Sequence, residues 1–292
     1  MWDKINIRKL EVAWKEKIKR REALWNIVDH VKFYILCSLF WSASIEVVKH
    51  GYRKYKLERL PEDTDANKLL RDFYNDHKSH IDVGRWLITE GAKTAFVMIA
   101  QVHGNFLNDG GMGQKWLLCQ REIYDFLRKY LQGHPEIKIY EEWLTVNNIA
   151  EIREGQIQLD EAKKLARLNA SIDWRKRPEF ADVGEHAGFK MLAEFPETIL
   201  PIDDESLLES QEVNYRKTPF WLLLLKYISW QPVMDDWARD THFVQTIGRD
   251  QRTLSLFILW NAHNLETEVE KWNTEHPEEK ISFLVYTPDS LK

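Results

Sequence analysis

Arg71 and His77 are the side chains whose types and spacing most directly suggest a chemistry. The arginine is followed by the polar residue Asp72, and the histidine lies six positions after the arginine in a segment with a helical pattern. A guanidinium stays charged at all working pH values and pairs with phosphate, whereas an imidazole gains and loses a proton near neutrality. A pair of this kind can therefore cleave RNA without a metal ion.

The Arg71/His77 spacing resembles the Arg-x(4–6)-His signature of HEPN-type ribonucleases. These are helical bundles in which a polar residue commonly follows the arginine, as Asp72 does here. In that family two copies of the motif meet across a dimer. The resemblance implies that Arg71 stabilises charge at the scissile phosphate and that His77 transfers a proton during attack by the ribose 2′-hydroxyl. The same two residues are also consistent with a solvated helix face that has no catalytic role.

A zinc site is an alternative use of the same segment. His77 and His80 are three positions apart, with the carboxylate of Asp82 nearby, and a further ligand from Glu46 or His50 would complete a site. The chain contains no His-Glu-x-x-His, Glu-x-x-His or Cys-x-x-Cys motif. We therefore predict no metal site and no cofactor.

Two other patterns could bind ions, but each has a simpler interpretation. The glycine-rich stretch Gly110–Gly113 and Lys115 could present backbone amides and a cation to an anion. It lacks the spacing of a Walker sequence, and a flexible connector explains it as well. The acidic runs at 203–205 and 235–236 could bind magnesium, yet adjacent carboxylates point in different directions. We interpret both runs as surface acid.

Positive charge is concentrated at the start of the chain, although the net charge of the whole is −5. Up to residue 60 there are 14 Lys and Arg against 7 Asp and Glu, which gives +7 and leaves −12 for the remainder. A basic face of this kind can follow the phosphates of a nucleic acid. It is equally consistent with a solvated helix face, or with docking against the acidic part of the same chain. The candidate binding residues in this segment are Lys17, Arg20, Arg21, Arg53 and Lys54.

A second basic cluster follows one of the 13 tryptophans. Trp174 is followed directly by three cations, and a ring beside cations suits either a stacked base or the hot spot of a protein interface. The cluster could instead anchor a loop without any ligand. The candidate binding residues here are Trp174, Arg175, Lys176 and Arg177.

The elements that must position these residues are expected to be mostly helices. Glycine (12) and proline (9) are scarce, and apolar residues recur every third or fourth position along much of the chain. The segment Leu60–Asp65 supplies a break and several N-cap candidates before the helix that carries Arg71 and His77. The expected helices cover about 4–28, 30–57, from 65 onward, 116–130, 159–168 and 220–230.

The carboxy-terminal part has a different pattern. Residues 253–260 and 281–286 are predicted to be strands and 265–272 a helix between them, which suggests a βαβ unit. The short apolar run at 95–102 fits a strand or a helix equally well, and 181–201 is expected to be mostly loop. The predicted fold class is mainly α, with a multi-helix domain at 1–200 and a smaller α/β portion at 201–292.

The chain has the features of a cytoplasmic protein. Cys37 and Cys119 lie in apolar periodic segments, as buried thiols in a reducing compartment do. The charged first residues lack the apolar core of a signal peptide, and the apolar run at 33–45 is too short to span a bilayer. We expect no contact with a membrane.

No complete catalytic set is evident, and the abundance of aromatic residues favours contacts with other proteins. We therefore predict a protein-interaction protein, such as an adaptor, inhibitor or complex subunit, that has a protein partner and no small-molecule substrate. One alternative is a metal-independent ribonuclease of the toxin or defence type that uses Arg71 and His77. Another is a protein that binds nucleic acid through its basic amino-terminal helices.

Overall fold

The computed structural model describes residues 51–102, 112–168, 186–210, 234–261 and 263–292 of the chain. The chain forms two compact units, Met1–Glu58 and Arg59–Lys292. In the first unit the described residues form a helix over 51–57, and the second unit contains a β-sheet.

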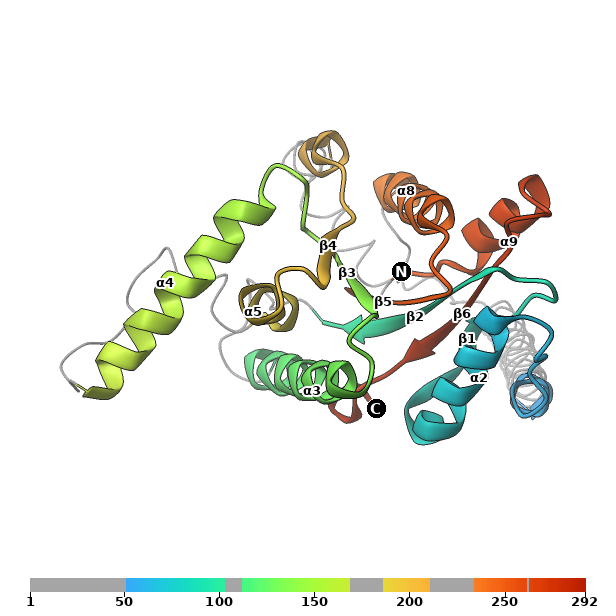
Figure 1. The fold of residues 1–292 in the computed structure, drawn as a ribbon, viewed down its shortest axis with the longest axis horizontal. Coiled ribbons are helices and arrows are strands. Elements are labelled where there is room, and N and C mark those ends of the chain that lie inside the picture. The colour runs from blue at the N-terminus through green and yellow to red at the C-terminus, as the bar shows by residue number, and fades with distance from the viewer. Residues whose placement is uncertain (1–50, 103–111, 169–185, 211–233, 262) are drawn as a thin grey trace, which may run out of the picture. The chain divides into compact units, whose positions relative to one another are not determined.

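A six-stranded mixed sheet forms the centre of the second unit (Figure 1). The strand order is β1-β6-β2-β5-β3-β4, and the pairing of β1 with β6 is antiparallel, whereas the other pairings are parallel. Both β5 and β6 pair with β2, one on each side of it. The strands are β1 (Ile81–Leu87), β2 (Thr94–Gln101), β3 (Lys138–Glu141), β4 (Ile199–Pro201), β5 (Leu254–Trp260) and β6 (Ile281–Tyr286).

The prediction of a mainly helical fold is wrong, because the sheet makes this an α/β fold. β3 and β4 have four and three residues, which is too short for an alternating pattern to be recognised. β2 is buried at every position, and a continuous apolar run of that length does not distinguish a strand from a buried helix. The sheet also pairs strands from both sides of residue 200.

Helices cover both faces of the sheet, as Figure 1 shows. The helices α8 (Met234–Asp250) and α9 (Glu266–Glu275) lie on one face. On the other face lie α2 (Asp65–His77) and α3 (Met112–Gly133), and α5 (Ala187–Glu194) packs against α3 and α4 (Ile149–Leu168). Parallel strands that are joined by helices produce this three-layer arrangement.

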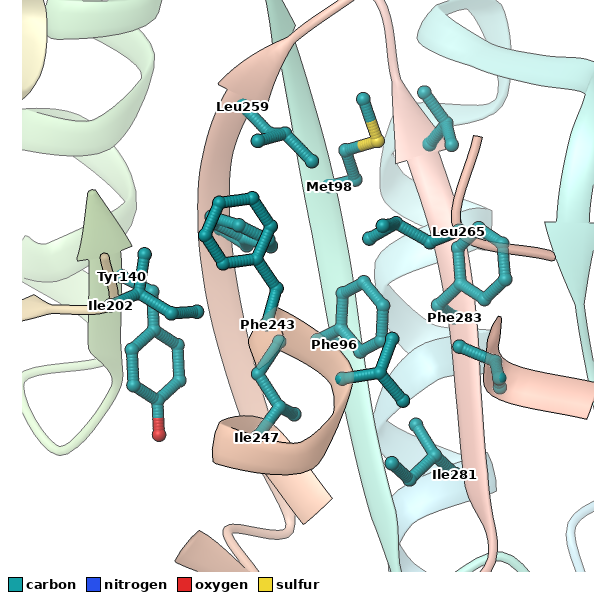
Figure 2. Packing of buried hydrophobic residues seen from close by; sticks show 14 of the residues in the cluster. Phe96, Met98, Tyr140, Ile202, Phe243, Ile247, Leu259, Leu265, Ile281 and Phe283 are labelled. Atoms are coloured by element: carbon teal, nitrogen blue, oxygen red, sulfur yellow. The ribbon is translucent and has the colours of Figure 1, made fainter. Parts of the chain in front are cut away.

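Alternate residues of the central strands fill the space between the sheet and α8 (Figure 2). Phe96 and Met98 of β2 lie in this cluster with Phe243 of α8 and Leu265, which precedes α9. Val97 points to the opposite face, because successive residues of a strand alternate, and it is equally buried. The central strands β2, β5 and β6 are therefore buried on both faces.

Several predicted elements are confirmed. The helix α2 begins after the predicted break, and Thr64 caps it by accepting a hydrogen bond from the backbone N–H of Asn67. The predicted strands at 253–260 and 281–286 correspond to β5 and β6, and the helix between them to α9. The described helices include none that is long and apolar enough to cross a bilayer.

Other expectations about elements are wrong or fall on residues that are not described. The prediction of mostly loop at 181–201 is wrong, because this segment contains α5 and β4. The sequence did not predict β1, β3 or α8. The expected helices at 4–28 and 220–230, and the first part of the one at 30–57, lie outside the described residues.

Candidate functional site

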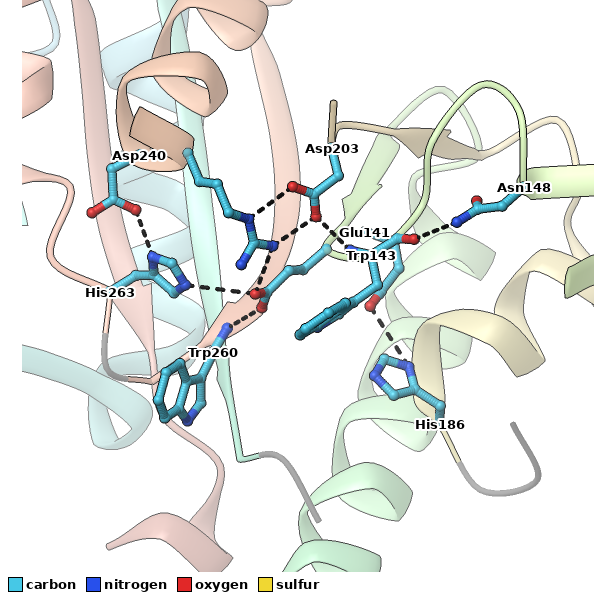
Figure 3. A network of polar contacts seen from close by, with 10 residues as sticks. Glu141, Trp143, Asn148, His186, Asp203, Asp240, Trp260 and His263 are labelled. Carbon is cyan, nitrogen blue, oxygen red and sulfur yellow. Dashed lines mark hydrogen bonds and ion pairs between the residues drawn. The ribbon is translucent and has the colours of Figure 1, made fainter. Parts of the chain in front are cut away.

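The carboxyl ends of β3, β4 and β5 bring together several buried polar and charged side chains (Figure 3). β3 ends at Glu141, Asp203 comes two residues after the end of β4, and β5 ends at Trp260. In open α/β sheets, ligands bind outside the carboxyl ends of the strands. The fold therefore favours a site at this edge.

A tight turn follows β3 and presents these side chains. The backbone N–H of Leu144 donates to the carbonyl of Glu141 (3.3 Å), and Trp143 between them has a φ of 75°. A positive φ at the third residue is typical of a type II turn, where glycine or asparagine is favoured. The carboxylate of Asp203 accepts from the N–H of Trp143 (2.7 Å), and the side chain of Asn148 donates to the Trp143 carbonyl (2.9 Å). Residues after β4 and before α4 thus hold the turn.

A network of five hydrogen-bonded and ion-paired side chains of alternating charge, the charged network, lies between this turn and α8. Arg239 donates to Asp203 through Nε (2.9 Å) and Nη2 (2.7 Å), and to Glu142 through Nη2 (3.0 Å). His263 Nε2 lies 3.5 Å from Glu142, and its Nδ1 lies 2.5 Å from Asp240. Each of the five side chains is shielded from water, since none is more than 7% exposed. Acidic and basic side chains alternate along the charged network.

The neighbours of each side chain in the charged network determine its pKa and therefore its charge. Burial acts to lower the pKa of His263, but the hydrogen bonds and charges of Asp240 and Glu142 outweigh it and raise the pKa to about 10. Burial raises the pKa of Asp203, and Arg239 opposes that rise. A histidine held as a cation between two acids does not accept a proton. The charged network is therefore suited to hold the edge of the sheet together and to set the electric field there. It is not suited to transfer protons.

A second polar group lies on the opposite side of β3, since consecutive residues of a strand point to opposite faces. Glu141 is fully buried, and its Oε1 lies 3.6 Å from Nδ1 of His186, the residue that precedes α5. Within the part of the chain that the structure describes, neither carboxylate oxygen of Glu141 has a hydrogen-bond partner. Glu141 therefore differs from Asp203 and Glu142, whose carboxylates accept hydrogen bonds from Arg239.

Burial raises the pKa of Glu141 well above its ordinary value, and the neighbouring carboxylates of Glu142 and Asp203 raise it further. Glu141 therefore keeps its proton where an exposed glutamate would have lost it. A protonated carboxyl beside an imidazole can move a proton between the two groups. Glu141 and His186 thus have the chemistry of an acid–base pair.

Two buried amides and one glycine hold α5 against this pair. Gln120 of α3 accepts from the backbone N–H of Ala187 (2.7 Å) and donates to Gln101, the last residue of β2 (3.0 Å). At Gly188 a β-carbon would collide with the carboxylate of Glu141. A glycine is needed here because α5 must approach the end of β3 closely.

Arg71 and His77 both lie on α2, but they have different neighbours. Arg71 donates to the carbonyl of Leu60 (3.2 Å) and pairs with Glu62 (2.5 Å). His77 is half-buried, and burial lowers its pKa. Its ring lies among those of Phe73, Phe126, Tyr130 and Tyr286. The ribonuclease hypothesis stays a prediction, and RNA cleavage in the presence of a chelator, compared with a His77→Ala variant, would test it.

The other candidate binding residues are mostly not described. Arg53 and Lys54 lie on the helix over 51–57, and Lys54 is exposed. The remaining ones fall outside the described ranges, and so do Gly110 and Gly111, whereas Met112 and Gly113 begin α3. The residues outside are Lys17, Arg20, Arg21, Trp174, Arg175, Lys176 and Arg177.

The histidines of the hypothetical zinc site have other partners. His80 lies 3.4 Å from Asp289, and Asp82 accepts from Arg85 (2.8 Å). Among the residues with described positions, no group of three His, Cys, Asp or Glu is placed to hold a metal ion. Glu46 and His50 lie outside them.

The residues at the carboxyl edge were not predicted from the sequence. The prediction that Asp203 is surface acid is wrong, because Asp203 is buried and bound to Arg239. Glu141 and Glu142 directly follow a short apolar segment, and an acidic pair at the end of a strand was the one signal that could have indicated them. His186 and His263 carry no local motif.

No protein-family model, curated protein or solved structure matches this chain. The function is therefore inferred from the fold and from the geometry of the residues at the carboxyl edge of the sheet. They define an α/β protein with a buried acid–base pair at the carboxyl edge of a six-stranded sheet.

Proposed function

We propose that the chain is an enzyme that acts on a small polar substrate by general acid–base catalysis, in which His186 transfers a proton to the substrate and Glu141 supplies a proton to His186. The observation that supports this is the 3.6 Å approach of the buried Glu141 carboxyl to Nδ1 of His186. Active sites are enriched in groups with displaced pKa values, and α/β folds place their sites at this edge. The proposal competes with the sequence-based expectation of an interaction protein without a small-molecule substrate.

The two groups can move a proton as a unit. When the imidazole of His186 gives a proton to the substrate from one nitrogen, the neutral carboxyl of Glu141 can supply a proton to the other nitrogen. The carboxylate that forms then accepts a hydrogen bond from the new N–H of the imidazole, which is neutral again. Reversal of both transfers restores the pair.

Turnover of an unspecified substrate can be tested with a pool of small metabolites. The purified protein would be incubated with the pool, and consumption of each compound would be followed by mass spectrometry. We expect at least one compound to be consumed, and His186→Asn to slow its consumption about 100-fold or more. The proposal is wrong if no compound is consumed, or if this variant is as active as the wild type.

His134→Asn is the matched control, because it is the same substitution at a histidine between α3 and β3. His134 lies at the amino end of β3, whereas Glu141 lies at its carboxyl end. It should consume the compound at the wild-type rate. Glu141→Gln keeps the size of the side chain but removes its acidic proton, so it should lower kcat with little change in KM and alter the pH profile. A merely structural role for Glu141 would leave the profile unchanged.

Partner binding through the first unit is a second candidate function. Tyr52 and Tyr55 are 58% and 49% exposed, and the predicted binding residues Arg53 and Lys54 lie between them in sequence. Tyrosine and arginine are enriched at the hot spots of protein interfaces. We propose a protein partner for this helix. A Tyr52→Ser/Tyr55→Ser variant should lose any partner that the wild type retains from a host lysate, and equal recovery would contradict this.

A further inference from the structure

Gln101, the last residue of β2, has one side-chain N–H group that requires a partner. Its Oε1 accepts from Nε2 of Gln120 (3.0 Å), but its own Nε2 has no hydrogen-bond partner within the residues that the structure describes. Gln101 is fully buried, so bulk water does not reach that donor. A buried N–H group without a partner is costly, and its presence needs an explanation in the residues around it.

The orientation of the Gln101 amide is fixed by a series of hydrogen bonds that begins beside His186. The backbone N–H of Ala187 can only donate, so the atom of Gln120 that faces it must be the carbonyl oxygen Oε1 (2.7 Å). Nε2 of Gln120 is therefore the atom that faces Gln101, and it requires an acceptor there. Oε1 of Gln101 is that acceptor, so Nε2 of Gln101 must point away from Gln120.

The register of the sheet places Glu141 on the same face as Gln101. Glu141 of β3 is paired with Ile258 of β5, and Ile258 is paired with Ile99 of β2. Paired residues of adjacent strands point to the same face, and so do Ile99 and Gln101, which are two residues apart in one strand. Gln101 and Glu141 therefore both point toward the face that α3 and α5 cover.

We propose that Gln101 is a positioning residue for the acid–base pair, whose Nε2 donates to Glu141 and holds the carboxylate that forms when Glu141 gives its proton to His186. This inference rests on the proposed function, in which that transfer takes place. Each group supplies what the other lacks, since the Glu141 oxygens also have no hydrogen-bond partner in the described ranges. Gln101 is close enough to Glu141 to oppose the rise in its pKa.

The charges around Glu141 explain why a neutral donor suits this position. Burial raises the pKa of Glu141 most, and the carboxylates of Glu142 and Asp203 raise it further, so each of these opposes formation of the carboxylate. A hydrogen bond from an N–H group to a carboxylate is stronger than one to a neutral carboxyl, so it favours the charged form. The amide of Gln101 does this at every pH without adding a positive charge beside His186, whose Nδ1 lies 3.6 Å from Glu141 Oε1.

Infrared spectroscopy can follow the protonation of Glu141 directly, with no substrate present. A protonated carboxyl has a C=O stretching band that a carboxylate lacks, and the band that is missing from Glu141→Gln belongs to Glu141. Gln101→Met keeps most of the side-chain volume but removes the donor. It should raise the pH midpoint at which the band disappears by about one to two pH units, because a hydrogen bond to a charged group is lost. Gln156→Met is the matched control, since Gln156 is a buried glutamine of α4 whose Nε2 donates to Asp160 (3.3 Å), and it should leave the midpoint unchanged.

An unchanged midpoint in folded Gln101→Met would overturn the inference. A wild-type Glu141 that stays protonated at every pH at which the protein is folded would also overturn it, because no carboxylate would then form for Gln101 to hold. If Gln101→Met does not fold, Gln120→Met decides. It keeps Gln101 but removes the group that orients its amide, so the midpoint should rise by a smaller amount, and an unchanged midpoint would contradict the inference.

Turnover distinguishes this inference from the proposed function. For any compound that the wild type consumes, Gln101→Met should lower kcat about tenfold and leave KM within about twofold, because Gln101 acts through Glu141 and not on the substrate. A higher midpoint without turnover of any metabolite would leave the Gln101–Glu141 hydrogen bond standing and contradict the enzyme. Turnover that depends on His186, together with an unchanged midpoint, would do the opposite.

Discussion

The carboxylate of Glu141 packs directly against the α-carbon of Gly188, where α5 approaches the end of β3. A side chain at position 188 would occupy the space that the carboxylate fills. The contact explains how a fully buried acid can lie beneath a helix. It also links the position of Glu141 to that of His186, which lies two residues before Gly188.

Gly188→Ala should destabilise the protein by about 1–3 kcal/mol, because the added methyl group overpacks a closed site. Urea unfolding followed by circular dichroism would measure the change. Gly155→Ala is the matched control, since nothing lies within 4 Å of the position of its β-carbon in α4, and it should be neutral or slightly stabilising. Equal stability of Gly188→Ala and the wild type would mean that α5 is not closely packed against Glu141.

Arg239→Met should destabilise the protein by about 3–5 kcal/mol. The substitution keeps most of the side-chain volume but leaves the buried carboxylates of Asp203 and Glu142 without their cation. Denaturant unfolding would show the loss as a lower midpoint. Arg252→Met is the control, because Arg252 pairs with Asp250 at a partly exposed position, and it should cost less than about 1 kcal/mol. Similar losses of stability in the two variants would indicate that the buried ion pairs of Arg239 contribute no more than an exposed one.

The parts of the fold that the sequence predicted are those with a strong local signal. Thr64 and the acidic residues after it mark the start of α2, and Gly133 marks the end of α3. β5 and β6 are long, rich in branched and aromatic residues, and bounded by polar turns. Each of these signals lies within the element that it predicts.

The sheet as a whole and the candidate site have no such local signal. β3 is a strand because it pairs with β4 on one side and with β5 on the other, and that pairing depends on segments far apart in the chain. Glu141 and His186 meet only after α5 has packed against α3. Asp203 belongs to an acidic run that is typical of a surface, and its burial follows from Arg239 on α8.

The His263–Asp240 contact should make stability depend on pH. The folded-state pKa of His263 is raised from 6.5 to about 10, so the folded state holds its proton more tightly than the unfolded state does. The stabilisation is fully present below pH 6.5 and is lost as the pH rises toward about 10. His263→Gln should therefore be less stable than the wild type at neutral pH, with a deficit that shrinks at alkaline pH.

Urea unfolding of the wild type and His263→Gln at several pH values would measure this deficit. Asp240→Asn is a second variant, because it removes the carboxylate that bonds His263 Nδ1. It should also weaken the pH dependence. A deficit that stays constant from neutral to alkaline pH would show that His263 is not held as a cation.

His77 should have the opposite pH dependence, because burial lowers its folded-state pKa below 6.5. The unfolded state then takes up a proton first as the pH falls, so the stabilisation is complete above pH 6.5 and is lost at acidic pH. His77→Phe keeps a ring among Phe126, Tyr130 and Tyr286 but cannot be protonated. The variant should therefore lose less stability than the wild type between about pH 7 and pH 5 in thermal unfolding. Parallel losses in the two proteins would show that the aromatic surroundings do not oppose protonation of His77.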